Sequence, residues 1–220
     1  MEFKAAIFDM DGTLIDSLML WDIFWATFGE RYLDDKDFAP DVEDDKRVRT
    51  LTLRDSMDLI HTKYKMGESG DELLSVANAI MIDFYANRVE LKAGVREFLE
   101  HCKNKGIKMC IASATARDLL EIAMKHCDLE KYFLKVFSCA EIGKGKEEPD
   151  IFLKAIEFLG TDVKETCLFE DSLTAIETAT KIGLPTVAIY DRYNFGQDRM
   201  KEIALEYIAE DETLMKIIKG

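Results

Sequence analysis

Two carboxylates lie two residues apart, just past a short apolar run near the start of the chain. The run 3–7 is predicted to be a buried strand, and Asp9 and Asp11 follow it. Alternation along an extended backbone would point both acids the same way, but Gly12 favours a bend beside them. Such a bend would let one carboxylate face a bound molecule while the other moves beside it. The alternative is a strand that ends in an Asx-Gly turn without any chemical role.

Polar side chains also follow three later strands that the sequence predicts: Ser113, Lys146 and the pair Glu170–Asp171. Ligands of open α/β sheets bind beyond the carboxyl ends of the strands. Each position also has an ordinary explanation, because a serine can cap a helix, a lysine can lie in a solvated loop, and an acidic pair can precede a helix. Taken together, these residues supply a carboxylate nucleophile, a hydroxyl donor, a cation and an acidic pair for a metal. That combination suits phosphoryl transfer.

The elements that must position these residues alternate between strand and helix from residue 92 onward. This alternation predicts a parallel sheet built from βαβ units. We expect helices at 95–105, 116–127, 149–158 and 174–181, strands at 107–112, 136–139, 166–169 and 185–189, and then an edge strand near 207–208 and a last helix near 214–218.

Residues 17–87 are predicted to be helical throughout, with helices near 47–61 and 71–85. The acidic stretch 34–45 has many carboxylates but lacks the ordered pattern of a calcium loop, so it is expected to be a solvated loop. The fold class is therefore α/β, with a Rossmann-like, doubly wound parallel sheet and an inserted all-helical cap. We expect the core domain to contain residues 1–16 and 88–220, and the cap domain residues 17–87.

The composition of the 220 residues limits the functions to consider. A formal net charge of −14 speaks against phosphate-backbone binding, because nucleic-acid binders carry basic patches. An anionic substrate would need a local positive site against this field. No apolar run reaches the roughly 18 residues of a membrane span, and the start of the sequence has no signal-peptide layout. The five cysteines lack metal-type spacing and are expected to be reduced, which favours a cytoplasmic protein without nucleic-acid or membrane partners.

Four segments match the motifs of a known family in the same order. Phe8–Ser17 resembles the first motif of the haloacid dehalogenase-like (HAD) superfamily, in the branch that carries a helical cap after this motif. Ile111–Thr115 resembles the second motif, and Lys146, three residues before Pro149, resembles the third. Leu168–Ser172 resembles the fourth. The resemblance covers the whole predicted core.

The resemblance implies a role for each residue. Asp9 would attack phosphorus and form an acyl-phosphate, which splits the reaction into two steps. Asp11 would act as general acid toward the leaving oxygen and then as general base toward water. Lys146 would neutralise charge beside Asp9, while Ser113 and the backbone N–H groups near Ala114 would bind the phosphoryl oxygens.

The resemblance also implies a metal ion and a closing cap. Asp9, the backbone carbonyl of Asp11, Asp171 and Glu170 would hold Mg²⁺, which prefers hard oxygen ligands. The cap would exclude water and supply substrate contacts.

Two arginines are candidate substrate contacts. Arg54 lies in a segment that resembles the cap of the family's mutases, and Arg117 follows Ser113 by about one helical turn. The alternative for both is a solvated arginine on a helix surface.

The presence of Asp11 narrows the reaction to phosphate-ester hydrolysis or intramolecular phosphoryl transfer, because the family's dehalogenases and phosphonate-cleaving members lack this second acid. The β-phosphoglucomutases carry a histidine shortly after the acid that corresponds to Asp16, where this chain has Trp21. We therefore expect a monomeric, Mg²⁺-dependent phosphatase acting on a small phosphorylated metabolite, with sugar phosphates among the candidates. The alternatives are a β-phosphoglucomutase-like phosphomutase and a non-catalytic phosphate-binding protein.

Overall fold

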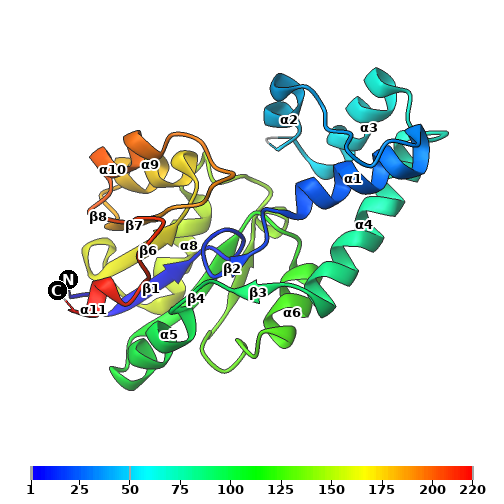
Figure 1. Cartoon of the computed structure of the whole chain (residues 1–220). Helices are drawn as coiled ribbons and strands as arrows, with labels where there is room; N and C mark the ends of the chain where they lie inside the picture. The colour runs from blue at the N-terminus through cyan, green and yellow to red at the C-terminus, as the bar shows by residue number, and fades with distance from the viewer. Residues whose placement is uncertain (1, 50, 220) are drawn as a thin grey trace. The chain divides into compact units, whose positions relative to one another are not determined.

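The computed structural model describes residues 2–49 and 51–219, and the chain divides into two compact units (Figure 1). One unit contains Met1–Leu18 and Val89–Gly220, and the other is Met19–Arg88. The assignment of these units as a core domain and a cap stays a prediction.

The larger unit is built on a six-stranded sheet in the order β5-β4-β1-β6-β7-β8, and every pairing in it is parallel. From β1 the chain adds strands outward on one side and then, starting with β6, on the other. The sequence-based fold class, a doubly wound parallel α/β sheet, is thereby confirmed. The order reverses between β1 and β6, and ligands of such sheets bind at that switch point. The strands are β1 (Ala5–Phe8), β4 (Lys108–Ser113), β5 (Val136–Ser138), β6 (Thr166–Glu170), β7 (Thr186–Ile189) and β8 (Glu206–Ile208).

Strand β1 is buried on both faces, as expected for the centre of a parallel sheet. On one face Phe8 stacks on Phe169 of β6, with ring centroids 4.6 Å apart, and Phe98 of α5 packs against both rings. On the other face Ala5 and Ile7 join the apolar cluster formed with α8 and α9. This double burial fixes the register of β1, because a slip by one residue would exchange its two faces.

Helices flank the sheet, and most lie within one or two residues of the expected positions. The helices of this unit are α5 (Val95–Asn104), α6 (Arg117–His126), α7 (Cys139–Ile142), α8 (Asp150–Leu159), α9 (Leu173–Lys181), α10 (Gln197–Ile203) and α11 (Lys216–Lys219), with a 3-10 turn at Val163–Glu165.

Three features of this unit were not predicted. The two-residue strands β2 (Ile15–Asp16) and β3 (Glu90–Leu91) pair antiparallel at the two ends of the helical insertion. Strands this short carry no readable alternation. The four-residue helix α7 and the helix α10 were missed for a related reason, since neither presents a repeated apolar face long enough to detect.

The smaller unit contains only helices: α1 (Leu20–Leu33), α2 (Val42–Val48), α3 (Leu53–Tyr64) and α4 (Gly70–Asn87). The expected helix at 47–61 is wrong at its start, because α2 ends at Val48 and Thr52 caps α3 by accepting the N–H of Asp55 at 3.2 Å. The acidic loop is also shorter than expected, since Asp41 caps α2 by accepting the N–H of Asp44 at 2.9 Å. No helix of the described residues is long and apolar enough to cross a membrane.

Candidate active site

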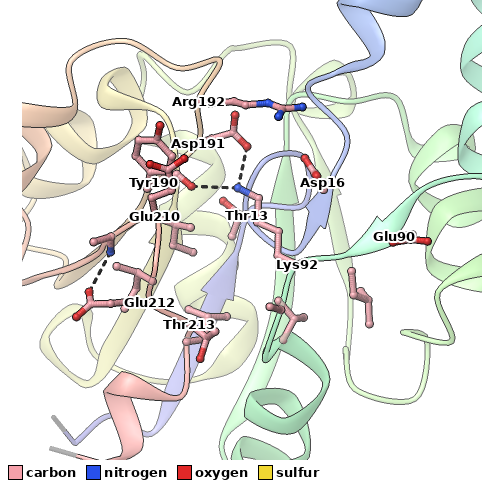
Figure 2. Close-up of a pocket in the computed structure, with 17 residues that line it drawn as sticks. Thr13, Asp16, Glu90, Lys92, Tyr190, Asp191, Arg192, Glu210, Glu212 and Thr213 are labelled. Carbon is pink, nitrogen blue, oxygen red and sulfur yellow. Dashed lines mark hydrogen bonds and ion pairs between the residues drawn. The ribbon is translucent and has the colours of Figure 1, made fainter.

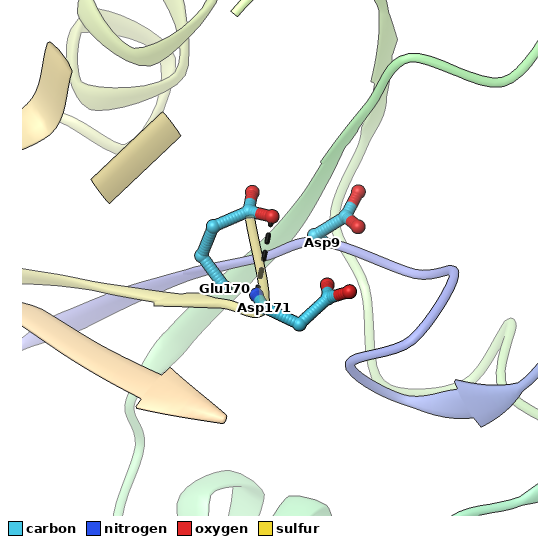
Figure 3. Close-up of side chains that lie close together, drawn as sticks. All are labelled: Asp9, Glu170 and Asp171. Atoms are coloured by element: carbon cyan, nitrogen blue, oxygen red, sulfur yellow. Dashed lines mark hydrogen bonds between the residues drawn. The ribbon is translucent and has the colours of Figure 1, made fainter. Parts of the chain in front are cut away.

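Three carboxylates converge where the strand order reverses. Asp9 follows β1, Glu170 ends β6 and Asp171 comes next, and ligand oxygens of all three lie within 4.8 Å of one another (Figure 3). All three side chains are buried. Because β1 and β6 are hydrogen-bonded neighbours, with Phe8 opposite Phe169, the sheet itself brings these acids together.

Lys146 is the cation within this cluster. Its Nζ lies 2.7 Å from Asp9 Oδ1 and 2.7 Å from Glu170 Oε2. The contact with Glu170 is a hydrogen bond, whereas the contact with Asp9 is an ion pair without hydrogen-bond geometry. Three ionised carboxylates and one ammonium leave a formal charge of −2 in a buried space. Uncompensated buried charge is costly, so the cluster favours a further cation.

Burial and mutual repulsion shift the titration of these groups. Burial raises the pKa of Asp9 to about 6, with Lys146 opposing the shift and the charge of Glu170 adding to it. Burial also raises the pKa of Asp171, helped by the charges of Glu170 and Asp9. Burial alone would lower the pKa of Lys146, but the two carboxylates beside it outweigh burial and raise it. The ammonium therefore stays charged, and the acids gain from a positive charge, whether a proton or a metal ion.

The donor set fits Mg²⁺. It consists of hard carboxylate oxygens, which this ion prefers. Asp9 Oδ1 is buried and accepts no hydrogen bond among the described residues, and its ion pair with Lys146 leaves lone pairs of the carboxylate for a second cation. Gly12 brings the loop after β1 against Asp171: its φ is +77°, and a Cβ there would lie 2.1 Å from Asp171 Oδ2. The bend expected at this glycine is therefore present.

Asp11 points away from this cluster toward the loop after β4. Its Oδ1 accepts a hydrogen bond from Ser17 Oγ at 2.7 Å, and its Oδ2 accepts one from Thr115 Oγ1 at 2.8 Å. Two hydroxyl donors therefore hold this carboxylate, and it is not part of the cluster of three acids. This separation suits a proton-transfer group.

Ser113 ends β4, the neighbour of β1 on the side opposite β6. Because Phe8 pairs with Ile111, Ser113 lies beside the loop that carries the first two acids. Its buried Oγ accepts the N–H of Thr115 at 3.1 Å, which turns the chain sharply through Ala114. The turn places a hydroxyl and the backbone of this loop at the same edge of the sheet as the carboxylates.

The two arginines each form an ion pair within their own unit. Arg117 pairs with Glu141 and donates to the carbonyl of Val136 at 2.8 Å, so its guanidinium is directed toward β5 and α7. Arg54 lies on α3 of the helical unit, where it is exposed and pairs with Asp71. Substrate contact by either residue stays a prediction.

Sequence reasoning missed four side chains that hold the acids. Two of them, Ser17 and Thr115, are the hydroxyl partners of Asp11, and both lie inside the quoted motifs. Thr13 donates to Asp171 Oδ1 at 2.7 Å and also lies in a motif. Asn194 donates to the backbone carbonyl of Asp171 at 3.0 Å and to its carboxylate. Nothing in the sequence marks Asn194, because it lies in a loop after β7 where no motif falls.

A family model described as haloacid dehalogenase-like hydrolase matches residues 6–189. The chain belongs to this family. The match includes every strand end described above, and the prediction of a HAD-like hydrolase of the phosphatase and β-phosphoglucomutase branch is confirmed.

Relatives of this branch are similar over most of their length. A phosphorylated carbohydrates phosphatase of Thermotoga maritima is 27% identical over 213 residues, covering 96% of both chains. Hexitol phosphatase B of Escherichia coli is 32% identical over 182 residues, covering 80% of this chain and 78% of the relative. The crystal structure of a candidate β-phosphoglucomutase from Thermotoga maritima superimposes with a TM-score of 0.83 at 25% identity, covering 100% of this chain and 99% of that one.

Proposed function

We propose that this hydrolase is a Mg²⁺-dependent phosphatase that acts on a small phosphorylated carbohydrate through an aspartyl-phosphate at Asp9. The observation that carries the proposal is the buried cluster at the switch point, where three acids lie together, one ammonium contacts two of them, and negative charge is retained. Asp9, Asp171 and the backbone carbonyl of Asp11 would hold the ion. Glu170 adds charge, although its oxygens already accept from Lys146 and from the N–H groups of the next two residues.

In the first step a carboxylate oxygen of Asp9 attacks phosphorus, and the bond between phosphorus and the ester oxygen breaks. Bound Mg²⁺ would offset the repulsion between the two anions. Lys146 keeps its charge beside the nucleophile and stabilises the negative charge that develops on the phosphoryl oxygens. Ser113 and the N–H groups near Ala114 would bind those oxygens from the neighbouring strand.

Proton transfer falls to Asp11, which lies outside the cluster. As a carboxylic acid it gives its proton to the departing alkoxide. As a carboxylate it then takes a proton from water, whose oxygen attacks phosphorus while the bond to Asp9 breaks. Inorganic phosphate leaves, and both aspartates return to their starting states. The donors Ser17 and Thr115 fix where this carboxylate lies between the two steps.

The names of two relatives support a carbohydrate phosphate as the substrate. One acts on phosphorylated carbohydrates and the other on hexitol phosphates, as their names state. The overall negative charge of −14 makes the local ammonium of Lys146 necessary for binding any such anion.

A second candidate function is a phosphomutase, favoured by the close match to the candidate β-phosphoglucomutase along the full chain. A mutase must return the phosphoryl group to sugar faster than water removes it. Trp21 occupies the place of the histidine found in the family's mutases, and this difference favours hydrolysis.

A phosphate-release screen tests the proposal. Purified protein would be incubated with Mg²⁺ and a panel of hexose, pentose and hexitol phosphates, beside the Asp9→Asn variant. We expect free phosphate from at least one of them with wild type and none with the variant. Glucose 1-phosphate with a trace of the 1,6-bisphosphate is included, and an isomerised sugar phosphate with little free phosphate would establish the mutase instead. Absence of turnover across the panel would favour a phosphate-binding protein.

A further inference from the structure

We propose that Asn194 is a positioning residue that fixes the carboxylate of Asp171 for metal binding. The inference rests on the metal site of the proposed function and adds to it a residue outside all four motifs. It is argued from the hydrogen bonds of the loop that follows β7.

The side-chain amide of Asn194 donates hydrogen bonds to two oxygens of Asp171. Nδ2 donates to the backbone carbonyl at 3.0 Å and also to Oδ2 of the side chain. Thr13 Oγ1 donates to the other oxygen, Oδ1, at 2.7 Å. Each carboxylate oxygen therefore accepts one described hydrogen bond from a neutral side chain and keeps a second lone-pair direction for a cation. The carboxylate cannot rotate without breaking both bonds.

Neutral donors also suit the charge of this site. Asp171 is buried beside Glu170 and Asp9, and Lys146 contacts those two acids but not Asp171. A hydrogen bond from an amide or a hydroxyl stabilises the ionised carboxylate without neutralising it. The negative charge is thus kept for a metal ion.

The loop that carries Asn194 is anchored by a buried ion pair at its start. Lys92 Nζ lies 2.7 Å from Asp191 Oδ2 and donates to the carbonyl of Tyr190 at 3.1 Å, beside a pocket of about 310 Å³ (Figure 2). Asp191 is almost fully buried, and its other oxygen accepts the N–H of Tyr193 at 2.9 Å. The loop therefore leaves β7 in a fixed direction.

Hydrogen bonds within the loop then fix Asn194 itself. Its N–H donates to the carbonyl of Asp191 at 3.1 Å. Gln197 Nε2, from the first turn of α10, donates to the carbonyl of Asp191 at 2.9 Å and to that of Asn194 at 3.3 Å. The amide that holds Asp171 is thus supported by strand β7 on one side and by helix α10 on the other.

The test measures Mg²⁺ binding to the substrate-free protein by titration calorimetry. Loss of an outer-shell partner of a metal ligand typically costs about 10- to 100-fold in affinity, so we expect the Kd of Asn194→Ala to rise by that factor. Arg192→Ala is the matched control, because Arg192 lies in the same loop, is exposed, and donates its side-chain hydrogen bond to Tyr193. Its Kd is expected to stay within about twofold of wild type.

Two further measurements separate positioning from general damage to the fold. Phosphatase activity of Asn194→Ala should recover at high Mg²⁺, since the variant lacks affinity and not catalytic groups. Asn194→Leu keeps a branched side chain but lacks the N–H donor, so we expect it to lose the same Mg²⁺ affinity. This variant replaces Asn194→Ala in the test if the alanine variant does not fold.

The outcomes distinguish this inference from the proposed function. If wild type binds Mg²⁺ and both Asn194 variants bind it within twofold of wild type, the positioning role is overturned while the metal site stands. If wild type and Asp171→Ala alike bind no Mg²⁺, the metal site is overturned and this inference with it.

Discussion

Each unit of the molecule contains three neighbouring aspartate or glutamate residues, but their charges are balanced in opposite ways. In the helical unit these are Asp41, Asp44 and Asp45, at the start of α2, which we call the matched cluster or helical cluster. In the helical unit Asp41 lies 3.0 Å from Lys63, and Asp44 accepts from Tyr64 Oη at 2.6 Å and pairs with the same lysine. In the larger unit Lys146 pairs with Asp9 and Glu170, and no ion pair to Asp171 is formed among the described residues.

The third acid of the helical cluster is also matched. Asp45 pairs with Arg49 at 2.8 Å and accepts from Trp25 Nε1 at 2.9 Å. Hydrogen bonds, first from the N–H of Asp44 and then from Lys63, lower the pKa of Asp41 to about 2, whereas burial raises that of Asp9 to about 6. The carboxylates of the helical unit have nearby cations and hydrogen-bond donors that balance their charge. The carboxylates of the larger unit have fewer positive charges beside them than they carry negative charges. This contrast supports the proposal that the cluster in the larger unit is the active site.

The largest expected effect is that of Asp9→Asn, which removes the nucleophile. We expect the rate of phosphate release to fall by about 10⁴-fold or more. The free energy of unfolding of the metal-free protein should rise, since a buried charge in deficit is removed. Phosphate release and urea unfolding measure the two effects.

Asp41→Asn makes the same change in the matched cluster. Asparagine caps a helix as well as aspartate does, so activity should stay near wild type. The free energy of unfolding at neutral pH should fall slightly, because the charge that Lys63 and the Asp44 N–H stabilise is lost at an exposed position. A comparable loss of activity in the two variants would remove the distinction between the clusters.

Lys146→Met should produce the next largest effect. It leaves three buried acids without an ammonium, and we expect phosphate release to fall by about 10²- to 10³-fold. The melting temperature of the metal-free protein should also fall, and Mg²⁺ should restore more of it than in wild type. Lys63→Met, in the helical unit, provides the control, and its activity is expected to be unchanged because its partners lie in the matched cluster.

A smaller effect is expected from pH. The folded pKa of Asp9, about 6, lies above the unfolded value of about 3.9, so the folded state binds more protons between these values. The contribution of Asp9 to stability is therefore fully present below about pH 4 and is lost as pH rises through 6. In the metal-free protein, the gain in unfolding free energy from Asp9→Asn should grow from about pH 4 to 7.

The contribution of Asp41 to stability depends on pH in the opposite direction. Asp41 has a lowered pKa, so its contribution is present above about pH 4 and is lost as pH falls toward 2. Urea unfolding as a function of pH should show the two trends running in opposite directions. An Asp9→Asn gain that is independent of pH would mean that the Asp9 carboxyl does not titrate as described.

The smallest expected effect comes from the hydroxyls that hold Asp11. Thr115→Val keeps the shape of the side chain but removes the donor to Oδ2. If the lost hydrogen bond contributes about 1 kcal/mol to holding Asp11 in place in the transition state, kcat should fall by about fivefold. Thr27→Val is the control, because its hydroxyl donates to the backbone carbonyl of Ile23 within the same helix, α1. A kcat of Thr115→Val equal to that of this control would count against a role for the hydroxyl in catalysis.

The sequence was sufficient wherever one short segment determines its own structure. The apolar run of β1, the bend at Gly12 and the acidic pair after β6 are all local features, and the parallel order of the sheet follows from βαβ alternation. The positions of Lys146 and Ser113 followed from their places in the motifs. The metal-binding and catalytic roles themselves stay proposals.

What the sequence did not reveal depends on contacts between distant segments. Asn194 reaches Asp171 only because β7 packs beside β6 and the loop after it is tied down by Lys92. The pairing of β2 with β3 joins segments on either side of the helical insertion. The cap at Thr52 was overlooked because the apolar pattern continues across it, so periodicity alone merged two helices.

The pairing of β1 with β6 affects how the chain folds. Asp9 and Asp171 are far apart in the sequence of this unit, and they become neighbours only when β1 and β6 pair in register. A partly folded chain, in which these acids are still apart, would bind the ion weakly. Metal binding would therefore stabilise the folded sheet and not its precursors. We expect a divalent ion added during refolding to slow unfolding more than it speeds folding.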